Sequence, residues 1–356
     1  MNIEEMVALS VKHNAGDLHL CSGHSPFWRR CGRLEPVPDA RPVTTAQLEA
    51  WAKSWLTASR IRQFDQAGQL DFALTMADGV RLRANLFRQQ QGLSLALRLI
   101  ASHCPDLTEL KLPAIAHALL TLNDGLVLVT GATGSGKSTT LAALIGEINR
   151  EQARHIITLE DPIEFIHHSQ RSLIQQREIG LHSISFSEGL RGALREDPDI
   201  ILLGELRDGE TIQLALTAAE TGHLVLTTLH TRGATQAVER LVDLFPGTEK
   251  NQVRSQLAGS LKAVIAQRLE QGAEQGQARV ALFEVLVNTP AVANLIREGK
   301  THQLAGLLET GMQSGMQTFA QSLAGRRKAG LIAGPDRVQA GYPDLRTSCS
   351  RTSFQE

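Results

Sequence analysis

The sequence predicts an α/β protein in which a small α+β domain is followed by a larger domain with a mostly parallel sheet. The first observation is a glycine-rich turn at 131–138 that fits the pattern G-x-x-x-x-G-K-[ST] and lies between an apolar run and a helix-forming run. The second is that apolar runs of strand length recur after this turn, separated by helical patterns. The third is that residues 1–100 mix short helical segments with runs that alternate polar and apolar side chains.

The N-terminal part of the chain has the pattern of a small α+β domain. We expect a helix from Glu4 to Lys12, a strand at 17–20 and a helical segment from Ala46 to Phe64. Residues 81–87 alternate polar and apolar side chains, and residues 93–100 do so less strictly. This alternation predicts a pair of half-buried strands.

The domain boundaries follow from composition. Residues 102–113 contain two prolines and little periodicity, which is typical of a linker. We therefore expect one domain at 1–101 and a second at 114–334. The tail at 335–356 has no periodicity and is predicted to be disordered.

The second domain repeats strand and helix patterns along its length. Its predicted strands lie at 126–130, 155–159, 200–203, 224–229 and 280–287. Such alternation is typical of a mostly parallel sheet with helices on both faces. Because ligands of open α/β sheets bind beyond the carboxyl ends of the strands, functional residues are expected there.

The glycine-rich turn has the composition of a phosphate-binding loop. It comprises Gly131, Ala132, Thr133, Gly134, Ser135, Gly136, Lys137, Ser138 and Thr139. Its glycines allow the positive φ angles that turn backbone N–H groups inward, and the N-terminus of the following helix favours an anion. Lys137 adds a positive charge, and the Ser138 hydroxyl is the expected ligand of Mg²⁺. The loop alone predicts a protein that binds a nucleoside triphosphate.

Polar residues follow three of the predicted strands. Glu160, Asp161 and Glu164 come after the strand at 155–159, where an ordinary Asp-Pro turn is the alternative. Glu205 follows four apolar residues, at a position where a carboxylate can activate an attacking water. His230 ends the strand at 224–229, and the residues alone leave a structural and a catalytic role equally open.

Composition excludes several classes of function. The 36 Lys and Arg residues balance 37 Asp and Glu residues, so no excess positive charge favours nucleic acid or anionic lipid. No apolar stretch is long enough to span a membrane, and the acidic N-terminus is unlike a secretion signal, which predicts a cytoplasmic protein. The 4 cysteines form no C-x-x-C pair, which argues against a zinc module and a disulfide framework.

Several of these stretches resemble a known family, the secretion ATPases of type II secretion and type IV pili, and most of all its pilus retraction (PilT-like) members. The stretches are 131–140, 160–165, 194–202, 204–208 and 217–224. In that family the first is the Walker A loop and the second is the Asp box. The third and fourth form the Walker B segment, and the last is the His box. The resemblance begins at 16–20 and continues through 315–319, and it implies a RecA-like ATPase domain preceded by a PAS-like N-terminal domain.

The resemblance also implies roles for individual residues. Lys137 and Ser138 would hold the phosphates of ATP and Mg²⁺, and Glu205 would activate water. The Asp box residues Glu160, Asp161 and Glu164 would arrange metal and water. His230 would sense the γ-phosphate.

Arg83 and Arg98 lie on the predicted N-terminal strands, where the residues alone favour a solvent-exposed face. The resemblance instead implies that they reach the nucleotide across a subunit interface of a homohexamer. Gln91 precedes Gly92 where retraction motors tend to have an arginine, so the full set of inter-subunit arginines departs from the family pattern.

The resemblance further implies an inner-membrane platform protein as partner and a peripheral position at the membrane. Ala293 stands where retraction motors carry a cation, in a segment that the family links to retraction. A pilus extension or secretion ATPase and a nucleotide-binding adaptor without efficient turnover are therefore alternatives. A nucleic-acid translocase is disfavoured by the neutral charge and the 4% aromatic content.

Overall fold

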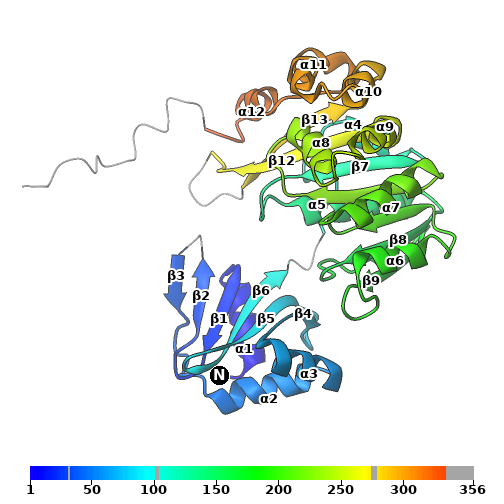
Figure 1. The fold of residues 1–356 in the computed structure, drawn as a ribbon. Coiled ribbons are helices and arrows are strands. Elements are labelled where there is room, and N and C mark those ends of the chain that lie inside the picture. The colour runs from blue at the N-terminus through cyan, green and yellow to red at the C-terminus, as the bar shows by residue number, and fades with distance from the viewer. Residues whose placement is uncertain (31–32, 101–103, 274–278, 334–356) are drawn as a thin grey trace, which may run out of the picture. The chain divides into compact units, whose positions relative to one another are not determined.

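The computed structural model describes residues 1–30, 33–100, 104–273 and 279–333 (Figure 1). The chain forms two compact units, each described by itself. The first contains Met1–Leu110, Ala116–Leu126 and Ser138–Thr228, and the second contains Lys111–Ile115, Val127–Lys137 and the residues from Leu229 onward. The predicted disordered tail lies outside the described residues, as do the first residues of the predicted linker.

The N-terminal part of the first unit is a six-stranded sheet of order β3-β2-β1-β6-β5-β4 in which every neighbouring pair is antiparallel. Its strands are β1 (Asp17–Cys21), β2 (Phe27–Arg30), β3 (Arg33–Pro36), β4 (Gln69–Thr75), β5 (Arg81–Gln89) and β6 (Gly92–Ile100). Its helices are α1 (Ile3–Lys12), α2 (Thr45–Trp55) and α3 (Ala58–Ala67). Apolar side chains of the helices pack with every second residue of the central strands, such as Leu82, Ala84 and Leu86, in one core.

The predicted helix at 4–12 and the predicted strand pair are confirmed, whereas the single helical segment at 46–64 is wrong. The segment is two helices, α2 and α3, because the backbone at Leu56 and Thr57 is extended. Thr57 caps α3 by accepting a hydrogen bond from the Arg60 N–H at 3.4 Å. In the sequence, the break between the two helices is indicated by Thr57, a residue type that favours the N-cap, directly after the apolar Leu56.

A seven-stranded sheet has the order β13-β12-β7-β11-β10-β8-β9. Its strands are β7 (Gly125–Thr130), β8 (His155–Glu160), β9 (Leu173–Glu178), β10 (Ile200–Leu203), β11 (Leu224–Leu229), β12 (Leu261–Glu270) and β13 (Val280–Val287). β10 pairs in parallel with β8 and with β11, and β8 pairs in parallel with β9. β12 and β13 are antiparallel, so the sheet is mixed and the prediction of a mostly parallel sheet is confirmed for the strands of the first unit.

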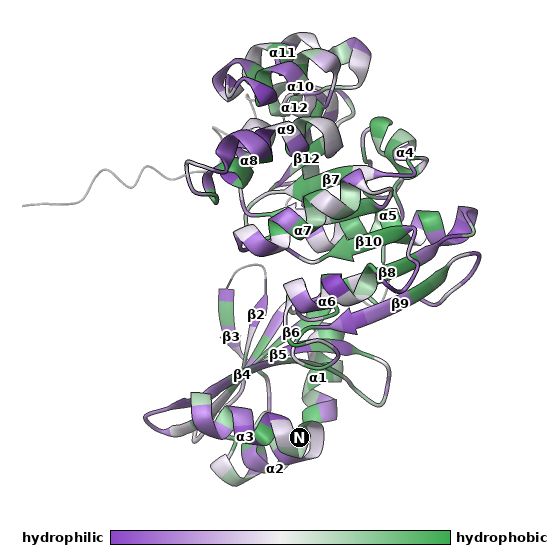
Figure 2. Ribbon diagram, turned by 45° about the vertical axis from the view of Figure 1, so that its right-hand side comes forward, coloured by the Kyte–Doolittle hydropathy of each residue, from purple (hydrophilic) through white to green (hydrophobic). Residues whose placement is uncertain are grey.

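All five strands predicted for the second domain are present, and β9 and β12 are additional. β10 is uniformly apolar and β7 is apolar up to Thr130, whereas β9 is largely hydrophilic (Figure 2). β9 has a single strand neighbour, β8, so it is an edge strand that does not need a continuous apolar sequence. β12 follows its preceding helix directly at Leu261, without a turn signal between them.

Several helices of the larger part of the chain begin at a side-chain cap. They are α4 (Ile115–Leu120), α5 (Lys137–Glu151), α6 (Phe186–Ala193), α7 (Gly209–Glu220), α8 (Ala234–Asp243), α9 (Lys250–Ser260), α10 (Pro290–Arg297), α11 (Leu304–Thr310) and α12 (Phe319–Lys328). Ser185, Asp208 and Thr289 are N-caps that each accept a backbone hydrogen bond. α6 ends at Ala193.

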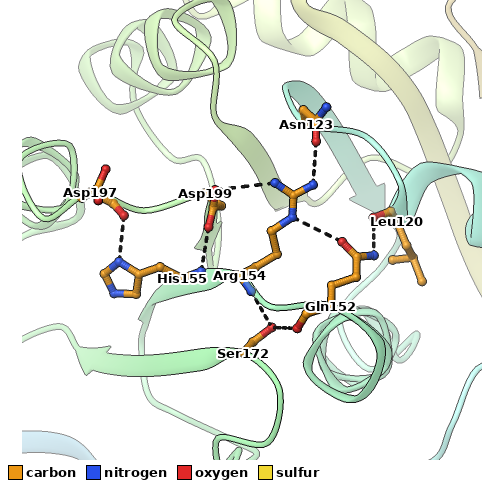
Figure 3. A network of polar contacts seen from close by, with 8 residues as sticks. All are labelled: Leu120, Asn123, Gln152, Arg154, His155, Ser172, Asp197 and Asp199. Atoms are coloured by element: carbon orange, nitrogen blue, oxygen red, sulfur yellow. Dashed lines mark hydrogen bonds and ion pairs between the residues drawn. The ribbon is translucent and has the colours of Figure 1, made fainter.

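A polar network fixes the starts of β8 and β10, the strands that lead to Glu160 and Glu205 (Figure 3). The Asp199 carboxylate accepts a hydrogen bond from the His155 N–H at 2.8 Å and forms an ion pair with Arg154 at 3.5 Å. His155 Nδ1 lies 2.9 Å from the Asp197 carbonyl oxygen, to which it donates. The network therefore sets the register at which both strands begin.

Among the helices that the structure describes, none is both long enough and apolar enough to cross a membrane.

Candidate active site

The glycine-rich turn follows β7, which is buried along its whole length. Gly131, Gly134 and Gly136 have φ angles of 154°, 76° and 91°. At Gly131 a Cβ atom would lie 2.4 Å from the Gln267 carbonyl oxygen and 2.5 Å from Ser135 Oγ. Backbone conformation and space therefore both require glycine here, as expected of a loop whose N–H groups turn inward.

Lys137 is buried and its ammonium group is held by the loop itself. Nζ donates to the carbonyl oxygens of Gly131 at 3.0 Å and Ala132 at 3.1 Å. It also lies 3.4 Å from His230 Nδ1. Because an ammonium group can only donate, this contact makes Nδ1 the acceptor and places the proton of a neutral ring on Nε2. Nε2 is then a hydrogen-bond donor, as a group that contacts a phosphate oxygen must be.

Two threonines keep the His230 segment beside the phosphate loop. The Thr231 N–H donates to Thr130 Oγ1 at 3.0 Å, and the Thr130 hydroxyl lies 2.8 Å from the Thr231 carbonyl oxygen. Thr130 is the last residue of β7 and is fully buried. The contact explains why His230, which is itself exposed, lies next to Lys137.

Ser138 and Thr139 lie in the first turn of α5, which begins at Lys137. Ser138 is exposed. Its hydroxyl fits an oxygen-seeking cation such as Mg²⁺, which binds through few protein ligands and completes its shell with phosphate and water oxygens. The described residues contain no group of three or more His, Cys, Asp or Glu side chains that could hold a metal ion.

Within the first unit, Glu205 follows β10 and pairs with Arg207 two residues later. The Arg207 guanidinium also lies 3.7 Å from Asp161. The hydrogen bond to Glu205 raises the pKa of Arg207 above its ordinary value. Two of the predicted carboxylates, Glu205 and Asp161, are thus brought together by an arginine that the sequence reasoning did not assign.

Glu160 ends β8 and has a different environment. Burial raises the pKa of its carboxyl group, and hydrogen bonds from the Thr158 and Gln176 side chains and from the Glu164 backbone partly oppose that shift. The Thr158 hydroxyl donates to Oε1 at 2.6 Å, and the Gln176 amide donates to the same oxygen at 3.1 Å. Sequence reasoning missed both donors, although a threonine inside an apolar strand run was a visible signal.

Asp161 and Glu164 lie close to N-terminal arginines of the same chain. Burial raises the pKa of Asp161, and the positive charges of Arg207 and Arg83 oppose the rise. Arg83 Nη1 is 3.9 Å from Glu164 Oε1. The structure therefore places Arg83 beside the Asp box within one chain.

Arg98 lies directly opposite Arg83 in the β5–β6 pair, but it makes a different contact. Its Nε donates to Asp17 Oδ1 at 2.9 Å, and its side chain is largely exposed. Gln91 lies in the exposed turn of the same hairpin, before Gly92 with φ 121°. Of the two predicted arginines, Arg83 alone is seen beside a carboxylate of the candidate site.

Comparison with known proteins shows which family and which relatives the chain resembles. The chain matches the family described as Type II/IV secretion system protein over residues 43–328. It is 61% identical over 332 residues to a protein of Escherichia coli K12 named Uncharacterized protein YggR, covering 93% of this chain and 100% of that one. It is 44% identical over 345 residues to the type IV pilus retraction ATPase PilT of Pseudomonas aeruginosa, covering 97% and 99% of the two chains.

A solved structure agrees with these relatives. The crystal structure of the pilus retraction motor PilT with bound ADP superposes with a TM-score of 0.85 at 39% identity. The match covers 97% of this chain and 98% of that one, so the RecA-like fold predicted for the larger domain is confirmed. With a match that spans residues 43–328 and relatives aligned over nearly their whole length, the chain belongs to the type II/IV secretion system protein family.

Proposed function

We propose that this chain is an ATP-hydrolysing motor of the type IV pilus and type II secretion class that drives pilus retraction. The observation that carries the proposal is a phosphate loop with a buried Lys137, in a chain similar along nearly its whole length to a pilus retraction ATPase. The protein is an ATPase, and the hydrolysis of ATP supplies the free energy for mechanical work.

The phosphate loop binds the β- and γ-phosphates. Its backbone N–H groups and the N-terminus of α5 favour an anion, and Lys137 supplies a full positive charge. The loop carbonyls that hold Nζ keep the ammonium group within the loop, where a phosphate oxygen can take their place. Mg²⁺, when bound at the Ser138 hydroxyl, neutralises charge on the phosphate oxygens.

Glu205 accepts the proton of the attacking water. Glu205 follows the carboxyl end of β10, where the functional groups of open α/β sheets lie. While Arg207 is paired with Glu205, its positive charge makes the carboxylate a weaker proton acceptor. A shift of the guanidinium toward phosphate would remove that charge and make Glu205 a stronger base. Glu160, Asp161 and Glu164 arrange the metal and the water.

The active assembly is a homohexamer. Arg83 and Arg98 occupy opposite positions on neighbouring strands, so they present two positive charges on one face of the N-terminal sheet. A neighbouring subunit's nucleotide can attract Arg98, and it can attract Arg83 when that side chain leaves Glu164 of its own chain, so hydrolysis then depends on a closed ring. The N-terminal domain is PAS-like, and the ring is peripheral at the inner membrane, where an inner-membrane platform protein is its partner.

Retraction is tested in a host that lacks its own retraction ATPase. We expect the chain to restore twitching motility, and the Glu205→Gln variant to fail while being expressed at the same level. Ala293 is half-buried and lies in the first half of α10. Ala293→Arg restores a cation at this position and is expected to raise the speed of retraction. Hydrolysis in the purified protein without any recovery of twitching would reject retraction and favour another motor role.

A further inference from the structure

Gln176 on β9 makes three hydrogen bonds with its side chain, all to the segment that contains the Asp box. Its Nε2 donates to Glu160 Oε1 at 3.1 Å and to the Phe165 carbonyl oxygen at 2.8 Å. Its Oε1 accepts from the His167 N–H at 2.8 Å. These bonds use both the donor and the acceptor groups of the amide.

The position follows from the strand pairing. β8 and β9 are parallel, and Gln176 is the register partner of Thr158. Both residues place a side-chain donor on Glu160, which ends β8 two residues after Thr158. The chain then turns through Phe165 and His167 before it returns as β9, so one amide links the end of β8 to the turn that follows it.

We propose that Gln176 is a positioning residue for hydrolysis, holding the Glu160 carboxylate and the Asp box segment in one arrangement. The inference rests on the proposed function, because Glu160 is a member of that site. Gln176 touches neither substrate nor metal in this account. It acts through Glu160.

The environment of Glu160 explains why such a donor is needed. A buried carboxylate is costly unless hydrogen bonds stabilise it, and its orientation is set by the donors around it. Loss of the Gln176 amide would leave the carboxylate with the Thr158 hydroxyl and the Glu164 backbone as its donors. It would also remove the partner seen on the Phe165 carbonyl group and on the His167 N–H.

The neighbouring glutamine provides a matched control. Gln175 precedes Gln176 on β9, and because side chains alternate along a strand, it points to the other face of the sheet. Its Oε1 lies 3.0 Å from His155 Nε2, in the network at the start of β8. Gln175→Met and Gln176→Met remove the same amide from adjacent positions of one strand.

The first measurement is steady-state ATP hydrolysis by the full-length chain with Mg²⁺. We expect Gln176→Met to lower kcat about tenfold, as the loss of a hydrogen bond to a charged group predicts, and to leave KM for ATP within about twofold. Gln175→Met is expected to keep the wild-type kcat and KM. Equal kcat values for Gln176→Met and wild type would overturn the proposal, as would equal losses in both variants.

A double-mutant cycle tests whether Gln176 acts through Glu160. If it does, Gln176→Met combined with Glu160→Gln hydrolyses ATP as fast as Glu160→Gln alone, because the carboxylate to be positioned is absent. Multiplied losses in the double variant would overturn the proposal. Gln176→Glu keeps the shape and the acceptor for the His167 N–H but not the donors, so a folded Gln176→Glu protein with reduced kcat supports the inference even where Gln176→Met fails to fold.

The outcomes separate the two claims. If Glu160→Gln and Glu205→Gln both hydrolyse ATP at the wild-type rate, the proposed function fails and Gln176 has no site to position. If both variants lose activity and Gln176→Met does not, the proposed function stands and the role of Gln176 is rejected.

Discussion

Glu160 and Glu205 show how neighbouring residues give two carboxylates different chemistry. Glu205 is paired with the Arg207 guanidinium, a full positive charge that favours the ionised carboxylate. Glu160 is buried and receives neutral donors from Thr158 and Gln176, and burial raises its pKa. A carboxyl group with raised pKa binds protons more tightly in the folded state, so its ionisation opposes folding.

Replacement of Glu160 by glutamine is therefore expected to stabilise the protein at neutral pH. Between the ordinary pKa of glutamic acid and the raised value, the folded state binds more protons than the unfolded state, so wild-type stability falls as pH rises through that window. Glu160→Gln removes this loss while it keeps an oxygen for the Thr158 and Gln176 donors. Thermal melts should show a higher Tm for the variant at pH 7.5 and a smaller difference at pH 4.5. A lower Tm for the variant at neutral pH would contradict this view of Glu160.

Lys137 is expected to dominate nucleotide affinity. Its ammonium group is buried in the loop, where a charge-assisted hydrogen bond to phosphate contributes about 1.5–3 kcal/mol. Lys137→Ala should weaken binding of a fluorescent ATP analogue by about tenfold to a hundredfold. Ser138→Ala keeps Lys137 and should lose affinity mainly in the presence of Mg²⁺. Undiminished binding by Lys137→Ala would refute the phosphate-loop assignment.

At the scale of elements, the strand β9 and the contacts between it and the turn before it could not be predicted from the sequence. The phosphate loop and the strand ends before Glu205 and His230 are local signals, and β7, β10 and β11 lie where the pattern predicted them. Gln176 and Arg207 gain their roles from contacts set by strand pairing and side-chain direction. A polar edge strand such as β9 also lacks the apolar run that identifies a buried strand.

His167, in the turn between β8 and β9, makes this element sensitive to acid. Burial, together with the nearby His168, lowers the pKa of His167 to about 4. The unfolded chain therefore binds this proton more readily, and stability is lost as pH falls below about 6.5 toward the folded pKa. Between pH 6.5 and 5 the expected loss is about 2 kcal/mol. Urea unfolding of His167→Gln should show a correspondingly smaller fall over this range, and parallel pH curves for variant and wild type would contradict it.

For the whole molecule, the proposed ring predicts complementation between subunits. Arg98 contacts Asp17 in its own chain, and its proposed action is on the nucleotide of a second subunit. Mixing Arg98→Ala with Glu205→Gln subunits should restore part of the ATPase activity, because some interfaces then combine an intact arginine with an intact base. Arg88→Ala is the control, since Arg88 pairs with Asp65 at the surface and should not lower the rate. No recovery at any mixing ratio would argue against Arg98 acting in trans.

The central claim is that this chain hydrolyses ATP with Glu205 as the base. The most direct test is the rate of phosphate release by the purified full-length protein with Mg²⁺, measured for wild type and for Glu205→Gln. Loss of a general base predicts a rate at least about a hundredfold lower in the variant, with nucleotide binding retained. Equal rates of phosphate release by the two proteins would contradict the account.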